Sequence, residues 1–481
     1  MYNMNRLSHS IRRIPSPRLI PASRNPISLR LNPTVQFSTN TMSQASAVVG
    51  NGDTKPNTWQ GAGAAEFDLR SDTMTKPTAS MLEAICQTTL LDDVFNEDPV
   101  TNELQRYVAE ITKHEASLLV LSGTMGNQVA IRSHLAQPPH SVLCDHRSHI
   151  ICYEAGGVSA WTGATMQTVV PKNGIHLTLE DIQKHAVLDD DIHHCPTKLI
   201  SLENTLDGMI MPLTEAKRIV EWAHSHDIKV HLDGARLWEA VVAGAGSLPE
   251  YAALFDSVSL CFSKGLGAPI GSIIVGPQDF IKKARWFRKS IGGGARQTGI
   301  IAAAAQVALK ETFGTDPCGQ GGKLAATHVK AKQVADLWTS RGGKLEQPPQ
   351  TNMVWLDLEA SGVGPNDLSL IGQEKGLKLS GGRIVVHYRT FLDLFEKQTL
   401  ISDLSQKYRT RRSLSWSKCL ILPSAASTKE VKIPASLTEV DSIFQLKNSA
   451  SVDKIFHIHP LTYVCTTPTA KHRGTNDGGA N

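Results

Sequence analysis

VSLCFSKGLG (258–267) and KVHLDGAR (229–236) are the two stretches that decide the fold. Each begins as a short apolar run and leads to a residue that carries chemistry, Lys264 in the first and Asp233 in the second. Short apolar runs separated by amphipathic segments predict parallel strands joined by crossover helices. Because the carboxyl ends of parallel strands share one edge of a sheet, we expect both side chains at the same site.

The same alternation extends outward from Glu66 to about Tyr388. Leu213 to His226 carries apolar residues at helical spacing, which predicts a strand, helix, strand unit with a right-handed crossover. The fold class is therefore α/β. The predicted strands include 141–144, 198–202, 229–232, 258–262 and 272–275, with a further strand at 353–358 in the second region.

The composition is that of a globular protein. The net charge of +4 is small for 481 residues, so nucleic acid is not an expected partner. No apolar run approaches the roughly 18 residues of a membrane helix, so no membrane association is expected either. The eight cysteines are scattered without a C-x-x-C pair, which favours neither a disulfide framework nor a metal site.

The two ends of the chain differ from its middle. Residues 1–52 contain six arginines and no acid, a composition typical of a mitochondrial presequence. The alternative is a cytoplasmic protein whose translation starts at Met42. We expect a large domain over 66–315 and a small carboxyl-terminal α+β domain, incomplete, over 316–388. Residues 389–481 show no sustained period, so we interpret them as a disordered tail or an error of the gene model.

The chemistry of the two strand ends indicates a cofactor. A partly desolvated lysine such as Lys264 can attack an aldehyde and form a Schiff base with pyridoxal 5'-phosphate. A buried carboxylate such as Asp233 keeps the pyridine nitrogen of that cofactor protonated. Arg236 can reach the phenolic oxygen of the ring or a substrate carboxylate. Alone, either motif is more often an ordinary turn, so it is their combination that carries the prediction.

Three further positions suit the same cofactor. Gly123 and Thr124, in SGTMGN (122–127), open a predicted helix whose free N–H groups can bind a phosphate. The imidazole of His149 can stack over the pyridine ring and transfer protons. His193 is a second candidate for proton transfer, although His194 beside it shows that this segment tolerates histidine generally.

Seven motifs, in order, resemble the low-specificity L-threonine aldolases over roughly residues 66 to 388. That family has the aspartate aminotransferase type of fold (fold type I), with a mostly parallel seven-stranded sheet. The motifs are DLRSDT (68–73), SGT (122–124), His149 with YEAGG (153–157), SLENT (201–205), HLDGAR (231–236), SKGLG (263–267) and GGGARQ (292–297).

The resemblance implies a role for each matching position. Lys264 is the Schiff-base lysine, Asp233 the partner of the pyridine nitrogen and Arg236 a contact to the ring oxygen. The other implied cofactor contacts are Gly123 and Thr124 at the phosphate, His149 on the ring, Ser263 and Arg296.

For the substrate, the resemblance implies that Ser71, Arg383 and Arg236 hold its carboxylate. The family forms homotetramers whose active sites lie between subunits, so Arg296, with Lys289, is expected to reach a neighbouring subunit's cofactor.

The implied reaction is the retro-aldol cleavage of L-threonine or L-allo-threonine to glycine and acetaldehyde, a step of threonine catabolism and glycine biosynthesis. One alternative is alanine racemisation, because some fungal alanine racemases resemble this family. The other is a protein that binds pyridoxal phosphate but is inactive because its carboxyl terminus is altered.

Overall fold

The computed structural model describes residues 59, 61–364 and 366–390. The expected leader (1–52) lies outside the described residues, and so does the expected tail (389–481) apart from its first two residues. Among the described helices, none combines the length and the apolarity that crossing a bilayer requires.

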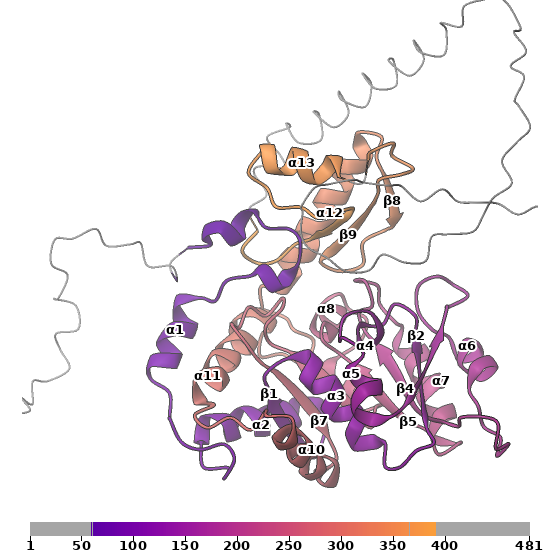
Figure 1. The fold of residues 1–481 in the computed structure, drawn as a ribbon. Coiled ribbons are helices and arrows are strands. Elements are labelled where there is room, and N and C mark those ends of the chain that lie inside the picture. Colours follow the sequence, from indigo (N-terminus) through magenta and orange to yellow (C-terminus); the bar gives the residue numbers. More distant parts are fainter. Residues whose placement is uncertain (1–58, 60, 365, 391–481) are drawn as a thin grey trace, which may run out of the picture. The chain divides into compact units, whose positions relative to one another are not determined.

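A seven-stranded sheet forms the centre of the large domain (Figure 1). Its strand order is β1-β7-β6-β5-β4-β2-β3; β2 to β6 run parallel, whereas β7 is antiparallel to both of its neighbours. The predicted α/β class is therefore confirmed. The strands are β1 (Ala116–Val120), β2 (Ser141–Asp145), β3 (Thr165–Val169), β4 (Thr197–Glu203), β5 (Lys229–Asp233), β6 (Ser257–Cys261) and β7 (Ser272–Gly276).

Helices cover both faces of this sheet, as the alternation of side chains along β1 shows. Leu118 and Val120 pack in a cluster with residues of α3 and α10, whereas Leu119 belongs to a second cluster with residues of α2, α7 and α11. The helices of the large domain are α1 (Ala79–Cys86), α2 (Pro99–Thr112), α3 (Gly123–His134), α4 (His149–Cys152), α5 (Gly157–Thr162), α6 (Leu179–His185), α7 (Leu213–His224), α8 (Leu237–Val242), α9 (Leu248–Ala252), α10 (Gln278–Ser290) and α11 (Gly299–Ala308).

Local sequence explains where the helices begin and which face they bury. Asp98 caps α2 through the N–H of Thr101 at 2.8 Å, and Pro99 occupies the first helical position. The predicted helix at 213–226 is α7, which ends at His224 and buries Ala216, Ile219, Val220 and Ala223 on one face.

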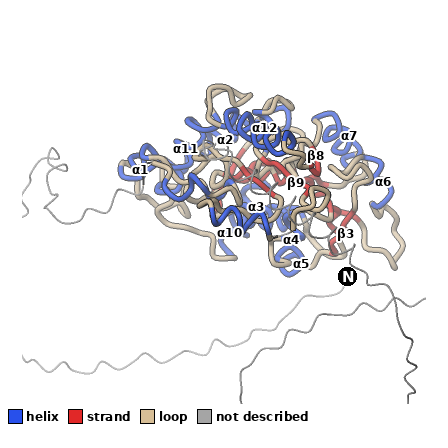
Figure 2. The backbone as a smooth tube through the Cα atoms, turned by 90° about the horizontal axis from the view of Figure 1, so that it is seen from above, coloured by secondary structure: helices blue, strands red, loops and turns tan. Residues whose placement is uncertain are grey.

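A second sheet of three antiparallel strands, β8 (Lys344–Gln347), β9 (Met353–Asp357) and β10 (Arg383–Val385), packs with α12 (Leu324–Ser340) and α13 (Asp367–Glu374) (Figures 1 and 2). An early segment of the chain joins this unit. Leu69 is buried in its apolar cluster, and the backbone N–H of Leu69 donates to the carbonyl of Lys378 at 3.0 Å. The motif around Ser71 is thereby fixed next to β10, more than 300 residues later in the chain.

Candidate active site

Asp233 and Lys264 lie at the same edge of the large sheet. Asp233 is the last residue of β5 and pairs in register with Glu203 of β4 and Ser259 of β6. Lys264 follows β6 by three residues, and its carbonyl accepts the N–H of Gly267 at 2.9 Å in a tight turn. Gly267 has φ +83°, and a Cβ there would lie 2.2 Å from the hydroxyl of Tyr388, so this turn requires glycine.

Both oxygens of the buried Asp233 carboxylate have a fixed donor. The amide Nδ2 of Asn127, on α3, donates to Oδ2 at 2.7 Å, and the backbone N–H of Ala235 donates to Oδ1 at 3.0 Å. Lys264 is half-buried, and its charge acts on the carboxyl groups of Asp72 and Glu203. An acid and an amine therefore converge at this edge, as the two sequence motifs predicted.

His149, the first residue of α4, is held beside this acid by two carboxylates. Its Nδ1 donates to Oε1 of Glu154 at 2.8 Å, and its backbone N–H donates to Oε2 of Glu203 at 2.9 Å. Polar atoms of His149, Glu154 and Asp233 lie within 4.8 Å of one another. Burial, together with the charge of Asp233, raises the pKa of Glu203 above its ordinary value.

The predicted phosphate turn opens α3. Ser122 caps the helix by accepting the N–H of Met125 at 3.1 Å, which leaves the first N–H groups, those of Gly123 and Thr124, to point beyond the helix start. A Cβ at Gly123 would lie 2.8 Å from the sulfur of Cys261, so glycine lets the helix start approach the end of β6.

These groups fit pyridoxal phosphate. Lys264 offers the amine, Asp233 a buried carboxylate with both oxygens already oriented, and the start of α3 an anion site. His149 supplies an imidazole whose tautomer is fixed by Glu154.

Arg236 and the residues predicted to hold the substrate lie close to the small sheet. Arg236 binds the buried carboxylate of Asp72 through Nε and Nη2. Ser71 precedes Asp72 and caps a short 3₁₀ turn by accepting the N–H of Thr73. Arg383 of β10 donates from Nη2 to the carbonyl of Arg70 at 3.0 Å, so the structure brings Arg383 and the Ser71 segment together.

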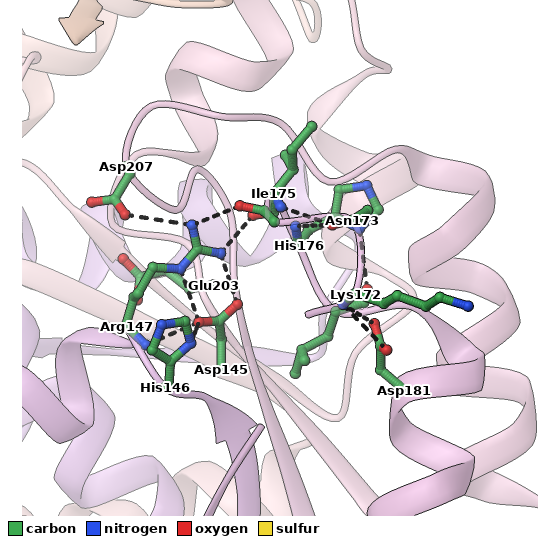
Figure 3. Close-up of polar contacts among 12 residues, drawn as sticks. Asp145, His146, Arg147, Lys172, Asn173, Ile175, His176, Asp181, Glu203 and Asp207 are labelled. Atoms are coloured by element: carbon green, nitrogen blue, oxygen red, sulfur yellow. Dashed lines mark hydrogen bonds and ion pairs between the residues drawn. The ribbon is translucent and has the colours of Figure 1, made fainter. Parts of the chain in front are cut away.

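Arg147 ties three loops together at this edge (Figure 3). Its guanidinium donates to the carboxylate of Asp145 at 3.1 and 2.9 Å and to the carbonyls of Gly174 and Ile175 at 3.1 and 2.8 Å. Nη1, which donates to Gly174, also lies 3.9 Å from the carboxylate of Asp207. These contacts fix the loops that follow β2, β3 and β4.

Asp207 extends this arrangement to the small domain. Its carbonyl accepts the indole N–H of Trp355 at 2.8 Å, and Trp355 pairs in register with Arg383. The loop after β4 therefore fixes β9, the strand that pairs with β10 and its Arg383.

A family model described as beta-eliminating lyase matches residues 68–361. The chain belongs to the beta-eliminating lyase family.

Three relatives show how this member compares with known proteins. The chain is 54% identical over 340 residues to aldolase vrtJ of Penicillium aethiopicum, covering 70% of this chain and 86% of that protein. It is 45% identical over 337 residues to the low specificity L-threonine aldolase of Saccharomyces cerevisiae, covering 70% and 85%. It is also 45% identical over 343 residues to alanine racemase TOXG of Cochliobolus carbonum, covering 71% and 88%.

Among solved structures, the threonine aldolase of Leishmania major matches with a TM-score of 0.60 at 19% identity, covering 71% of this chain and 99% of that chain. At this identity the match concerns the fold alone. The predicted resemblance and the fold type I architecture are therefore confirmed. Pyridoxal phosphate, the predicted cofactor, follows from membership of the beta-eliminating lyase family.

Within its own chain, His193 does not lie beside Asp233, so its role as a proton-transfer residue stays a prediction. It lies in the loop that leads into β4, and that loop is at the amino edge of the parallel strands, opposite Asp233. Its side chain is 82% exposed and binds Asp191 at 2.7 Å. Residue type alone suggested His193, and the direction of β4 places it at the opposite edge of its own chain's sheet.

Arg296 lies away from Lys264 within the chain. Its side chain is 55% exposed and pairs with Asp92 at 2.8 Å. The expected role of Arg296 at a neighbouring subunit's cofactor stays a prediction.

Four residues of the site were not named from the sequence: Asn127, Glu154, Glu203 and Asp72. Asn127, Glu154 and Asp72 stand in or beside motifs that contain a predicted residue, whereas Glu203 stands in SLENT (201–205), which contains none. Their burial and their partners, which mark them as part of the site, become visible only in the structure.

Proposed function

We propose that the chain is a carbon-carbon lyase that cleaves L-threonine or L-allo-threonine to glycine and acetaldehyde. The observation that carries the proposal is the convergence of Lys264, Asp233 and His149 at one sheet edge, in a chain 45% identical to a low specificity L-threonine aldolase over 70% of its length. The cofactor accepts the electron pair left on the α carbon of a bound amino acid.

Each residue of the site has a separate role in the proposed reaction. Lys264 would hold the aldehyde of the cofactor, and Asp233 would hold the proton on its pyridine nitrogen. Arg383 and Ser71 hold the substrate carboxylate, with Arg236 close by. Because Nδ1 of His149 donates to Glu154, the other ring nitrogen is free to accept the proton of the β-hydroxyl group as the Cα–Cβ bond breaks.

Incubation of the full-length protein with pyridoxal phosphate and each of two substrates tests this proposal. L-threonine should give acetaldehyde and glycine in equal amounts, and Lys264→Ala should abolish both. D-alanine formed from L-alanine without acetaldehyde from L-threonine would favour the racemase, to which the chain is equally similar. Neither product, with the cofactor bound, would indicate the inactive protein.

We also propose a homotetramer with shared sites. Leu90, Leu91 and Phe95 are 58%, 50% and 70% exposed on the segment beside Arg296, as is Ile300 at 44%. An apolar surface next to a cationic side chain is typical of an interface. Light scattering after size exclusion should give four times the chain mass. Mixing Arg296→Ala with Lys264→Ala should restore partial activity, because a mixed pair contains one site with both residues intact.

A further inference from the structure

Asn127 donates hydrogen bonds to two carboxylates of the proposed site, those of Asp233 and Glu154. It lies on the first turn and a half of α3, is 1% exposed, and its Nδ2 donates to Asp233 Oδ2 at 2.7 Å and to Glu154 Oε1 at 2.8 Å. Asp233 faces the pyridine nitrogen in the proposed function, whereas Glu154 holds His149. One amide group therefore orients both carboxylates.

The orientation of this amide is fixed by its surroundings. Carboxylate oxygens accept, so the NH₂ of Asn127 must face Asp233 and Glu154. Its Oδ1 then accepts from Nε2 of the fully buried His231 at 3.2 Å. A flipped amide would place its carbonyl against two acceptors.

A buried chain of hydrogen bonds behind His231 reinforces this arrangement. With its proton on Nε2, His231 accepts the hydroxyl of Ser257 on Nδ1 at 2.8 Å, and Ser257 accepts Nε2–H of His134 at 2.7 Å. Burial lowers the pKa of His231 to about 4 and that of His134 to about 3, so both rings are neutral and carry one proton each. Each donor in this series of hydrogen bonds therefore has one acceptor. His134 donates to Ser257, Ser257 donates to His231, and His231 donates to Asn127.

Without the amide, two buried carboxylates would face each other without a shared donor. Unpaired buried acceptors are costly. The like charges of Asp233 and Glu154, whose carboxylate oxygens lie within 4.8 Å of each other, also repel. The site would respond by moving one carboxylate or by protonating it, and either response changes what Asp233 and His149 present to the ring.

We propose that Asn127 is a positioning residue for the cofactor, which sets Asp233 against the pyridine nitrogen and, through Glu154, His149 against the ring. The inference rests on the proposed function for the roles of Asp233 and His149. Asn127 itself touches neither substrate nor cofactor in this scheme.

Asn127→Leu, which keeps the shape and removes both donors, tests the inference in the full-length protein. The dissociation constant of pyridoxal phosphate, measured by absorbance titration, should rise on the order of 10-fold to 100-fold. The absorption maximum of the bound cofactor should shift, and kcat for L-threonine should fall more than KM rises. Ser133→Ala is the matched control, since Ser133 is a buried polar residue of the same helix whose hydroxyl donates to the backbone carbonyl of Val129.

The outcomes separate the inference from the function. A wild-type protein that does not bind the cofactor or cleave threonine contradicts the proposed function. A wild type that does both, with Asn127→Leu equal to it in cofactor affinity, spectrum and kcat, overturns the role of Asn127. If Asn127→Leu does not fold, Asn127→Asp decides by the same measurements, because it keeps the shape and a polar group but places a third carboxylate at this point.

Discussion

Arg236 donates two hydrogen bonds to the carboxylate of Asp72, from Nε at 2.9 Å and from Nη2 at 2.7 Å. The two residues are 164 positions apart, and the Asp72 side chain has no exposed surface. Since a guanidinium has five N–H donors, three remain for the cofactor ring or the substrate. Asp72 therefore orients the guanidinium of Arg236 and leaves its other N–H groups available to a ligand.

This pair predicts a pH-dependent contribution to stability. Burial acts to raise the pKa of Asp72, but the charge and hydrogen bonds of Arg236 outweigh it and lower that pKa to about 2. The depressed pKa contributes about 2 kcal/mol to the free energy of unfolding, present above pH 3.8 and lost as the pH falls toward 2. Urea unfolding of wild type and Asp72→Asn should differ most at pH 6, and the difference should shrink by pH 3. A constant difference would contradict this, and the exposed Asp336→Asn serves as the control.

Substitutions of His149 and His193 should differ strongly in their effect on kcat. His149→Phe should lower kcat by about 10²-fold to 10⁴-fold, the usual contribution of a positioned proton acceptor. His193→Ala should stay within about twofold of wild type, because its exposed side chain lies at the opposite edge of the sheet. Steady-state kinetics with L-threonine measures both. A large loss in His193→Ala would show that the loop before β4 reaches a site.

The buried carboxyl group of Glu203 predicts a loss of thermal stability at alkaline pH in the cofactor-free protein. Burial and the charge of Asp233 raise its pKa from 4.5 to about 8, so folding favours the neutral acid. A raised acid pKa costs stability progressively as the pH rises from 4.5 through about 8. Glu203→Gln should therefore unfold at a higher temperature than wild type at pH 9 and at nearly the same temperature at pH 4. The exposed Glu97→Gln should follow wild type at both, and a variant less stable than wild type at pH 9 would refute the prediction.

Arg383 should act on substrate binding. Arg383→Ala removes the proposed carboxylate contact, so KM for L-threonine should rise on the order of 10-fold to 100-fold, with a smaller change in kcat. Arg341→Ala is the matched control, because Arg341 lies in the same domain and donates to the carbonyl of Leu337 away from the site. Equal KM values for the two variants would rule out the contact.

Much of this site follows from local sequence, because strands and their ends are local features. The predicted strands are present, and Lys264 and Asp233 lie at the same edge of the sheet. Strands β1 and β3 of the large sheet were not among them; β3 (Thr165–Val169) is polar and only partly buried.

The rest depends on contacts between distant parts of the chain. Asn127 meets Asp233 across 106 positions, and Leu69 joins a cluster formed by residues beyond 330. Nothing local to Asn127 or Asp72 distinguishes a helix-start polar residue from a partner of the site. His193 shows the converse, since its residue type did not indicate that its loop lies at the opposite edge of the sheet from Asp233.

The central claim is that Lys264 carries the cofactor, and chemical trapping tests it most directly. The full-length protein is loaded with pyridoxal phosphate, reduced with borohydride, digested and examined by mass spectrometry. Lys264 should carry a phosphopyridoxyl group, which should be absent from Lys264→Ala and weaker in Asp233→Ala. A group on another lysine, or none in a protein that releases acetaldehyde from L-threonine, would contradict it.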